Sequence, residues 1–214
     1  MESDKNKYWD EQHLRYARTD WIDRPTLFVQ SITNLLHVGG KLLDAGCGQG
    51  ADSRYFAQHG YEVTAMDFSD SALEIAQKKS AEHADQIKFV KGDLASPLPF
   101  MNASFDIVYS HLAVHYFSAS VTEKILAEFE RILKKDGVLA LLVNSTTDPE
   151  FNTGPEIEKD YFIIRNVSKR FFNTSTLAGF TRNFETMLLD DQGDTYKDRP
   201  ANTTNLIRFV GRKK

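Results

Sequence analysis

The chain has 214 residues, of which 41% are hydrophobic and 26% are charged, and its formal net charge is −4. This size and composition predict one globular domain over residues 1–214 with a sizeable core. The negative charge disfavours a general nucleic-acid-binding surface, which requires a basic face, and apolar runs such as Val138–Val143 are far too short to span a bilayer.

Two further features concern the compartment. Cys47 is the only cysteine, so no internal disulfide is possible, which suits a reducing cytosol. The N-terminal residues Met1–Lys7 contain no apolar signal core. We therefore expect a cytoplasmic protein with no membrane partner.

Residues 1–37 mix charged side chains with aromatic ones and precede the first predicted strand. They predict two helices, near Tyr8–Arg18 and Pro25–His37. Both tryptophans of the chain, Trp9 and Trp21, lie in this segment. We interpret residues 1–37 as a helical N-terminal cap.

Strands and helices alternate after residue 40. Five short apolar segments bounded by Gly, Asp, Pro or Ser predict strands at Lys41–Ala45, Glu62–Met66, Ile87–Lys91, Phe105–Ser110 and Val138–Asn144. The segments between them predict helices at Ala51–His59, Ser69–His83 and Val121–Leu133. This alternation implies a parallel sheet with helices on both faces.

The C-terminal part departs from the alternation. Residues 148–172 form an irregular insertion after the fifth strand, in which Tyr161–Ile164 and Lys169–Phe172 are candidates for a small hairpin. Thr174–Arg182 predicts a helix, and two closing strands, Phe184–Leu189 and Leu206–Val210, predict an antiparallel hairpin at the sheet edge. The predicted fold is therefore α/β: a doubly wound, mostly parallel seven-stranded sheet with an antiparallel C-terminal hairpin.

The most informative motif follows the first predicted strand. Asp44, Gly46, Gly48 and Gly50 form an acidic-x-G-x-G-x-G pattern that leads into a helix. Glycines there allow a ligand to approach backbone N–H groups at the helix N-terminus. A dinucleotide-binding turn places its third glycine differently, as G-x-G-x-x-G, and an acid at the strand end suits a cationic group better than a pyrophosphate.

Polar side chains also stand at the ends of the other four parallel strands, where ligands bind in open α/β sheets. Asp67 is suited to the two hydroxyls of a ribose, or alternatively to capping the next helix. Asp93 follows Gly92 and is alternatively a turn residue. The fourth and fifth strands end at Ser110 and Asn144.

Taken together, residues 41–145 resemble the class I S-adenosylmethionine-dependent methyltransferases, in their small-molecule branch. The resemblance rests on the glycine motif, Asp67, Gly92-Asp93-Leu94, Phe105–Val108 and Leu133–Val138, where Asp136 replaces the family's usual proline; Tyr8-Trp9-Asp10 resembles a common opening of that branch. It implies S-adenosyl-L-methionine as the cofactor. The cofactor-binding residues that it implies are Asp44, Gly46, Cys47, Gly48, Gly50, Asp67, Phe68, Asp93, Leu94 and Ser110.

The acceptor side is less defined by the sequence. If the chain turns helical after Ser110, His111 and His115 share one face and are candidates to accept a proton or orient the acceptor; alternatively they only line the crevice or bond the backbone. The predicted substrate pocket comprises Tyr8, Trp9, Tyr116, Asn144 and Tyr161. No metal is expected, because the histidine pair lacks a nearby third ligand.

The predicted function is methyl transfer to an unidentified small molecule by a monomer or homodimer. The alternatives are methylation of RNA or protein, a non-catalytic S-adenosylmethionine-binding protein and, more weakly, an NAD(P) enzyme. DNA is not expected as a partner, because no polar-Pro-Pro-aromatic motif follows the fourth strand. We also expect Tyr8–Arg18 and the insertion to close over the cofactor, with Tyr8, Trp9 and Tyr161 facing the acceptor; alternatively, the tryptophans only pack on the sheet flank.

Overall fold

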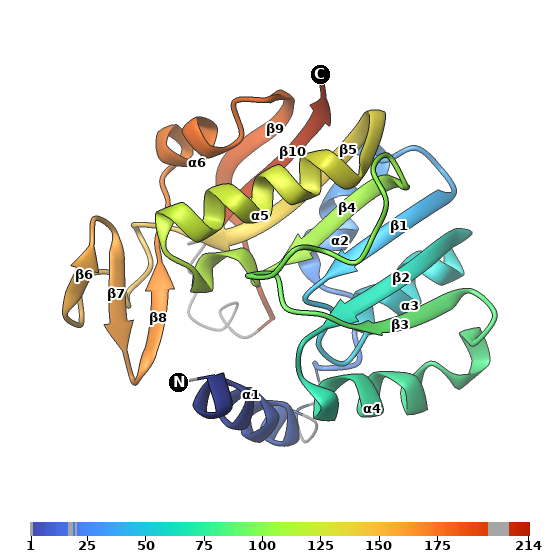
Figure 1. Ribbon diagram of the computed structural model, residues 1–214, viewed down its shortest axis with the longest axis horizontal. Coiled ribbons are helices and arrows are strands. Elements are labelled where there is room, and N and C mark those ends of the chain that lie inside the picture. Colours follow the sequence, from blue (N-terminus) through green and yellow to red (C-terminus); the bar gives the residue numbers. More distant parts are fainter. Residues whose placement is uncertain (1, 17–18, 20, 197–205) are drawn as a thin grey trace.

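The structure is a computed structural model that describes residues 2–16, 19, 21–196 and 206–214 (Figure 1). A central seven-stranded sheet has the order β3-β2-β1-β4-β5-β10-β9. Its strands are β1 (Gly40–Ala45), β2 (Tyr61–Asp67), β3 (Ile87–Lys91), β4 (Phe105–His111), β5 (Leu133–Asn144), β9 (Phe184–Gly193) and β10 (Leu206–Lys213). The first five are parallel, and β10 runs antiparallel to both β5 and β9. The predicted fold class is confirmed.

Helices cover both faces of the sheet (Figure 1). On one face lie α2 (Leu27–Ile32) and α3 (Ala51–Gln58), and on the other lie α5 (Ala119–Ile132) and α6 (Thr174–Phe180). Successive strand residues point to opposite faces, so neighbouring leucines enter different cores. Leu42 packs with Phe28 and Phe56, whereas Leu43 packs with Phe129. The remaining long helices are α4 (Asp70–Lys79), beside β2 and β3, and the N-terminal α1 (Glu2–Tyr16).

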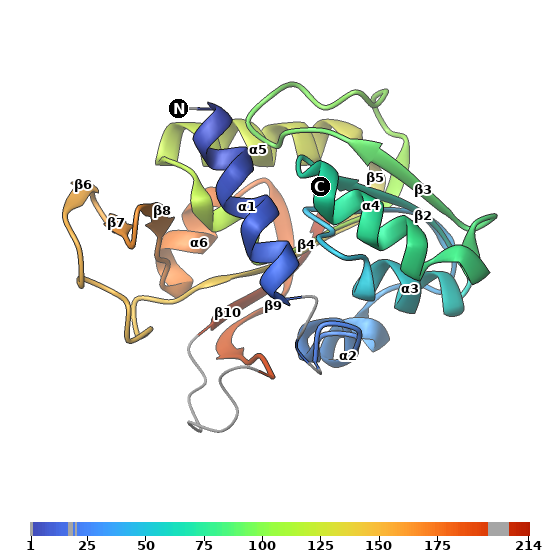
Figure 2. The ribbon, with the colours of Figure 1, turned by 90° about the horizontal axis from the view of Figure 1, so that it is seen from below.

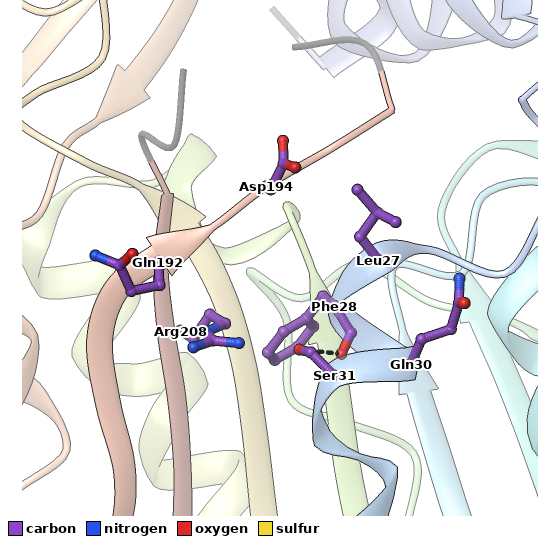
Figure 3. Close-up of a pocket in the computed structure, with 7 residues that line it drawn as sticks. All are labelled: Leu27, Phe28, Gln30, Ser31, Gln192, Asp194 and Arg208. Atoms are coloured by element: carbon purple, nitrogen blue, oxygen red, sulfur yellow. Dashed lines mark hydrogen bonds between the residues drawn. The ribbon is translucent and has the colours of Figure 1, made fainter. Parts of the chain in front are cut away.

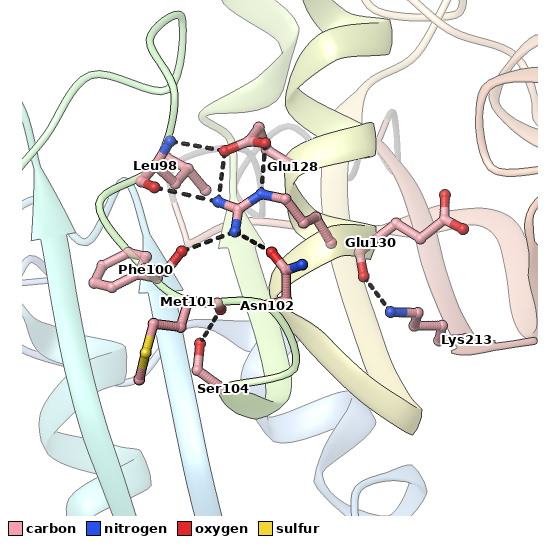
Figure 4. A network of polar contacts seen from close by, with 9 residues as sticks. Leu98, Phe100, Met101, Asn102, Ser104, Glu128, Glu130 and Lys213 are labelled. Carbon is pink, nitrogen blue, oxygen red and sulfur yellow. Dashed lines mark hydrogen bonds and ion pairs between the residues drawn. The ribbon is translucent and has the colours of Figure 1, made fainter.

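The loop before β4 is fastened to α5 by Arg131. Its guanidinium donates to both oxygens of Glu128, to the Asn102 side chain and to the carbonyls of Leu98 and Phe100 at 2.8–3.2 Å, contacts that Figure 4 shows converging on one side chain. The network fixes the entry into β4, whose far end reaches the ligand edge of the sheet.

The insertion after β5 forms its own three-stranded antiparallel sheet of β6 (Glu156–Glu158), β7 (Tyr161–Ile164) and β8 (Val167–Arg170). The predicted pairing of two of these strands is confirmed, but β8 begins two residues earlier than expected and β6 was not predicted. Arg170 is buried, bonded to Glu158 and placed over the Tyr161 ring. This ion pair therefore holds β6 against the rest of the insertion. The 3 residues of β6 are too few to establish a hydrophobic periodicity, so the strand could not be predicted from its sequence.

Several predicted element bounds are wrong. Helix α1 begins at Glu2 and ends at Tyr16, and Arg18 lies outside the described residues. The expected Pro25–His37 helix stops at Ile32 and continues as a 3₁₀ helix over Thr33–Leu35. Strand β9 runs to Gly193, because pairing with β10 extends it beyond its apolar part. None of the described helices is long and apolar enough to cross a membrane.

Candidate functional site

A cavity of about 730 Å³ lies along the carboxyl ends of the parallel strands. The strand order reverses between β1 and β4, which is where open α/β sheets form their ligand crevice. Asp44, Asp67, Asp93, His111 and Asn144, from or just after five different strands, all line it. Its volume lies within the range of about 300–1,000 Å³ that is usual for small-molecule sites.

The glycine turn forms one wall of this cavity. The N–H groups of Gly46 and Cys47 donate to the Met66 carbonyl at 2.8 and 3.0 Å, which ties the turn to β2. Gly46 has a φ of +84°, and a Cβ there would lie 2.5 Å from the Cβ of Ala113. Only glycine therefore fits this position. Gly46, Cys47 and Gly48 line the cavity, but Gly50 does not, because it is the N-cap of α3.

Asp44 is buried at the end of β1, and its Oδ2 accepts a hydrogen bond from Ser53 Oγ at 2.5 Å. Burial, and next the charge of nearby Asp52, raises the pKa of Asp44 to about 8. Asp52 itself accepts from the Tyr109 hydroxyl at 2.5 Å and from the Thr26 N–H at 2.7 Å. A cation beside these two carboxyl groups would relieve their repulsion.

Asp67 connects two backbone segments. Its Oδ2 accepts from the Gly48 N–H at 2.9 Å and its Oδ1 from the Ser69 N–H at 3.0 Å. The N-cap of α4 is Ser69, whose Oγ accepts from the Ala72 N–H, so the alternative role of Asp67 as that cap is wrong. Each carboxylate oxygen keeps a further lone pair for a ligand.

Asp93 and Leu94 follow β3 and line the cavity with Phe68. The Asp93 Oδ1 accepts from the Ala95 N–H at 2.9 Å, which is the bond expected of a turn residue. Asp93 can therefore act both as a turn residue and as a ligand contact, since one oxygen bonds the turn and the side chain still lines the cavity.

Helix α1 lies across the carboxyl edge of the sheet (Figure 2). Gln49 Nε2 donates to the His13 carbonyl at 2.7 Å, and Ser69 Oγ donates to Asp10 Oδ1 at 2.6 Å. The Trp9 ring meets the Tyr116 ring edge-on at 4.8 Å between centroids. Tyr8, Trp9, His13 and Trp21 all line the cavity.

The segment after β4 is not the helix that was expected. Strand β4 continues through His111, Leu112 has a φ of +52°, and only Val114–Tyr116 forms a 3₁₀ turn. His111 and His115 nevertheless both line the cavity, since the turn folds back over the strand end. His111 Nε2 and His115 Nδ1 are buried and have no hydrogen-bond partner within the described part of the chain. Burial lowers the pKa of both imidazoles.

Besides Gly50, two predicted site residues do not line the cavity. Ser110 is buried, and its hydroxyl donates to the Ala45 carbonyl at 2.8 Å, because strand alternation turns it away from the ligand edge. The Tyr161 hydroxyl donates to the Tyr116 carbonyl at 3.1 Å, so Tyr161 supports the wall from behind. Conversely, the cavity is also lined by three residues that were not predicted, because their spacing along the chain carries no recognisable signal: His13, Asp52 and Lys169.

Residues 43–141 match the protein family described as methyltransferase domain. The match covers a little under half of the chain, and the chain has the fold of the class I methyltransferases. A malonyl-[acyl-carrier protein] O-methyltransferase of Enterobacter lignolyticus is 39% identical over 101 residues, which cover 47% of this chain and 37% of that protein. The chain spans only 37–38% of the length of three such relatives.

Two other similarities extend further along the chain. The phthiotriol/phenolphthiotriol dimycocerosates methyltransferase of Mycobacterium leprae is 29% identical over 192 residues, covering 87% of this chain and 64% of that protein. The crystal structure of Burkholderia thailandensis 1,6-didemethyltoxoflavin-N1-methyltransferase, with bound 1,6-didemethyltoxoflavin and S-adenosylhomocysteine, superposes with a TM-score of 0.73 at 20% identity, covering 96% of this chain and 87% of that one. At this identity the structural likeness establishes the fold.

The structure also has a smaller pocket of about 390 Å³ between α2 and the last strands. Figure 3 shows Arg208 there, between Gln192 and Phe28. Its guanidinium is engaged by Asp190 through two hydrogen bonds of 2.8 and 2.7 Å. This cation is therefore already paired.

Proposed function

We propose that the protein is an S-adenosylmethionine-dependent methyltransferase that acts on a small molecule. The observation that carries this proposal is the cavity at the strand ends, where the acid-glycine turn of β1 meets Asp67 and Asp93. The match of residues 43–141 to a methyltransferase domain supports the same activity.

The residues present fit this cofactor. The Gly46 position, where a Cβ would collide with Ala113, leaves the turn's backbone open to a ligand, and Asp44 stands beside it for a cationic group. Asp67 is placed for the ribose hydroxyls, and Asp93, Leu94 and Phe68 for the adenine. When bound, S-adenosylmethionine supplies a methyl group activated by its positively charged sulfur. The protein then has to align the acceptor with that methyl group and exclude water.

The preference for a small acceptor rests on the way in which α1 encloses the cavity. Helix α1 is bonded to the glycine turn through Gln49 and to the start of α4 through Ser69, so it covers the cavity that a macromolecule would have to enter. The net charge of −4 further disfavours RNA and DNA. The oligomeric state and the absence of a DNA partner stay predictions.

Calorimetric titration with S-adenosylhomocysteine tests the cofactor part directly. The wild type is expected to bind, and Gly46→Ala to bind at least about tenfold more weakly, a loss of about 1.4 kcal/mol or more. Gly60→Ala is the matched control: Gly60 has the same φ of +84°, but its added Cβ meets no atom of the described residues within 4 Å. An unchanged affinity in Gly46→Ala, or a wild type that gives no binding heat with millimolar ligand, would contradict the proposal.

A further inference from the structure

The acceptor end of the cavity is walled by aromatic rings. Trp9 contacts both Tyr8, at 5.3 Å between ring centroids, and Tyr116, at 4.8 Å, each time edge to face. Tyr16 and Trp21 form a second pair at 5.6 Å. All five side chains line the cavity. Such walls favour a flat ring, which can pack against them in offset or edge-on geometry.

The cations at this end already have partners. Lys169 forms an ion pair with Glu150, and Arg165 approaches the same carboxylate at 3.8 Å. Arg24 lies over the Tyr196 ring at 5.6 Å. These are the lysine and arginines among the described residues that line the cavity. A carboxylate acceptor would therefore compete with Glu150 for Lys169 and Arg165.

Three histidines that line the cavity each have a buried ring nitrogen with no partner in the part of the chain that the structure describes: His13 Nδ1, His111 Nε2 and His115 Nδ1. His13 belongs to α1 and is near Asp10 and Asp67, whereas His111 and His115 follow each other at the end of β4. A buried polar atom without a partner costs free energy, so a ligand group that bonds to it is favoured. Neutral imidazoles accept or donate one hydrogen bond at each nitrogen, which matches an uncharged hydroxyl.

The charged groups near the two histidines differ. Asp52 is the charged side chain that acts on His111 and favours its protonated form, whereas Lys169 acts on His115 and disfavours it. Burial opposes the charge of both rings. His111 is also partly exposed at the end of β4, where it can pass a proton to water, whereas His115 is buried.

On the basis of the proposed function, we propose that the acceptor is a flat, uncharged aromatic alcohol, that His111 takes its hydroxyl proton and that His115 orients its oxygen. In this step the acceptor oxygen forms a bond to the methyl carbon, and the sulfur–methyl bond breaks with its electron pair staying on sulfur. The hydroxyl proton moves to His111 Nε2 and then to water, so charge and atoms balance.

Three probes with one ring system test the acceptor class: 2-naphthol, 2-naphthoate and 2-naphthylamine. With S-adenosylhomocysteine present, calorimetry is expected to detect 2-naphthol binding at least tenfold tighter than 2-naphthoate binding. With S-adenosylmethionine, 2-naphthol is expected to be the methylated probe. Tighter binding or faster methylation of the carboxylate or the amine would overturn the proposal, and so would rejection of all three probes.

Variants of the histidines test the division of roles. His111→Gln is expected to lower kcat for 2-naphthol by about 10²-fold or more, the usual contribution of a general base, with little change in KM. Its rate should recover above about pH 10, where a phenol ionises without help. His115→Gln should mainly raise KM and keep the wild-type pH profile. Equal effects of both variants on kcat, or no recovery of His111→Gln at high pH, would overturn the assignment.

S-adenosylhomocysteine binding distinguishes a failure of the proposed acceptor class from a failure of the proposed methyltransferase function. If the wild type and both histidine variants bind this product normally while the naphthol results fail, only the acceptor class is wrong. If the wild type does not bind it, the proposed function itself fails.

Discussion

At the residue scale, Asp44 shows a conflict between the proposed function and stability: binding a cation needs an ionised carboxylate, whereas burial of that side chain disfavours its charge. It is buried beside Asp52, and its carboxyl is best suited to a site that receives a cation. In the folded protein without ligand its pKa is raised to about 8, whereas an unfolded aspartate ionises near 3.8. The folded state therefore holds a proton that the unfolded state has released over that interval.

The sign of the pH dependence follows from this difference. The contribution of Asp44 to the free energy of unfolding is fully present below about pH 4, and it is lost as the pH rises towards about 8. Each pH unit of this loss is worth at most about 1.4 kcal/mol. Urea unfolding between pH 4 and 9 should therefore show a wild-type minus Asp44→Asn difference that falls with rising pH.

The same variant should also lose affinity for S-adenosylhomocysteine, because it removes the negative charge proposed to hold the ligand's cation. Asp85→Asn, which removes the same formal charge from the exposed surface, is the control. A difference curve that rises with pH would show that the folded protein instead favours ionised Asp44.

At the scale of elements, α1 decides how enclosed the site is. Its bonds to Gln49 and Ser69 lie next to the glycine turn and to Asp67, so ligand contacts there stiffen the surface on which the helix rests. Amide hydrogen exchange should show greater protection of residues 8–16 when S-adenosylhomocysteine is bound. Helix α6, on the far end of the sheet, is the internal reference.

The link through Gln49 offers a matched variant. Gln49→Glu keeps the side-chain length but removes the donor to the His13 carbonyl, so the protection gained in α1 should shrink. If residues 8–16 exchange at the same rate with and without ligand in the wild type, α1 is a fixed cover and does not close over the cofactor.

At the scale of the whole molecule, ligand binding should stabilise the fold by mass action. S-adenosylhomocysteine at 100 times its Kd adds about 2.7 kcal/mol, which corresponds to a rise in Tm of roughly 5–10 °C for a chain of this size. Scanning fluorimetry of Trp9 and Trp21 measures it. NAD at the same concentration should leave Tm unchanged; a matching shift with NAD would support the weaker alternative of an NAD(P) enzyme.

The sequence by itself determined the fold class and most of the elements that build it. Alternating apolar segments predicted the seven strands of the main sheet, because burial periodicity and turn residues are local properties. Asp44, Asp67 and Asp93 could be assigned to one edge without a structure, since parallel strands bring their carboxyl ends together. The resemblance of this stretch to a methyltransferase is confirmed.

Only the tertiary structure decided what faces the cavity from elsewhere in the chain. His13 and Lys169 reach it from segments more than 150 residues apart, and no spacing rule connects them. Tyr161 turned out to support Tyr116 from behind, and Ser110 to face Ala45, because side-chain direction depends on how the insertion and β4 pack. The burial of His111 Nε2 and His115 Nδ1 without a partner among the described residues is likewise a product of packing, since it depends on which segments the fold brings around them.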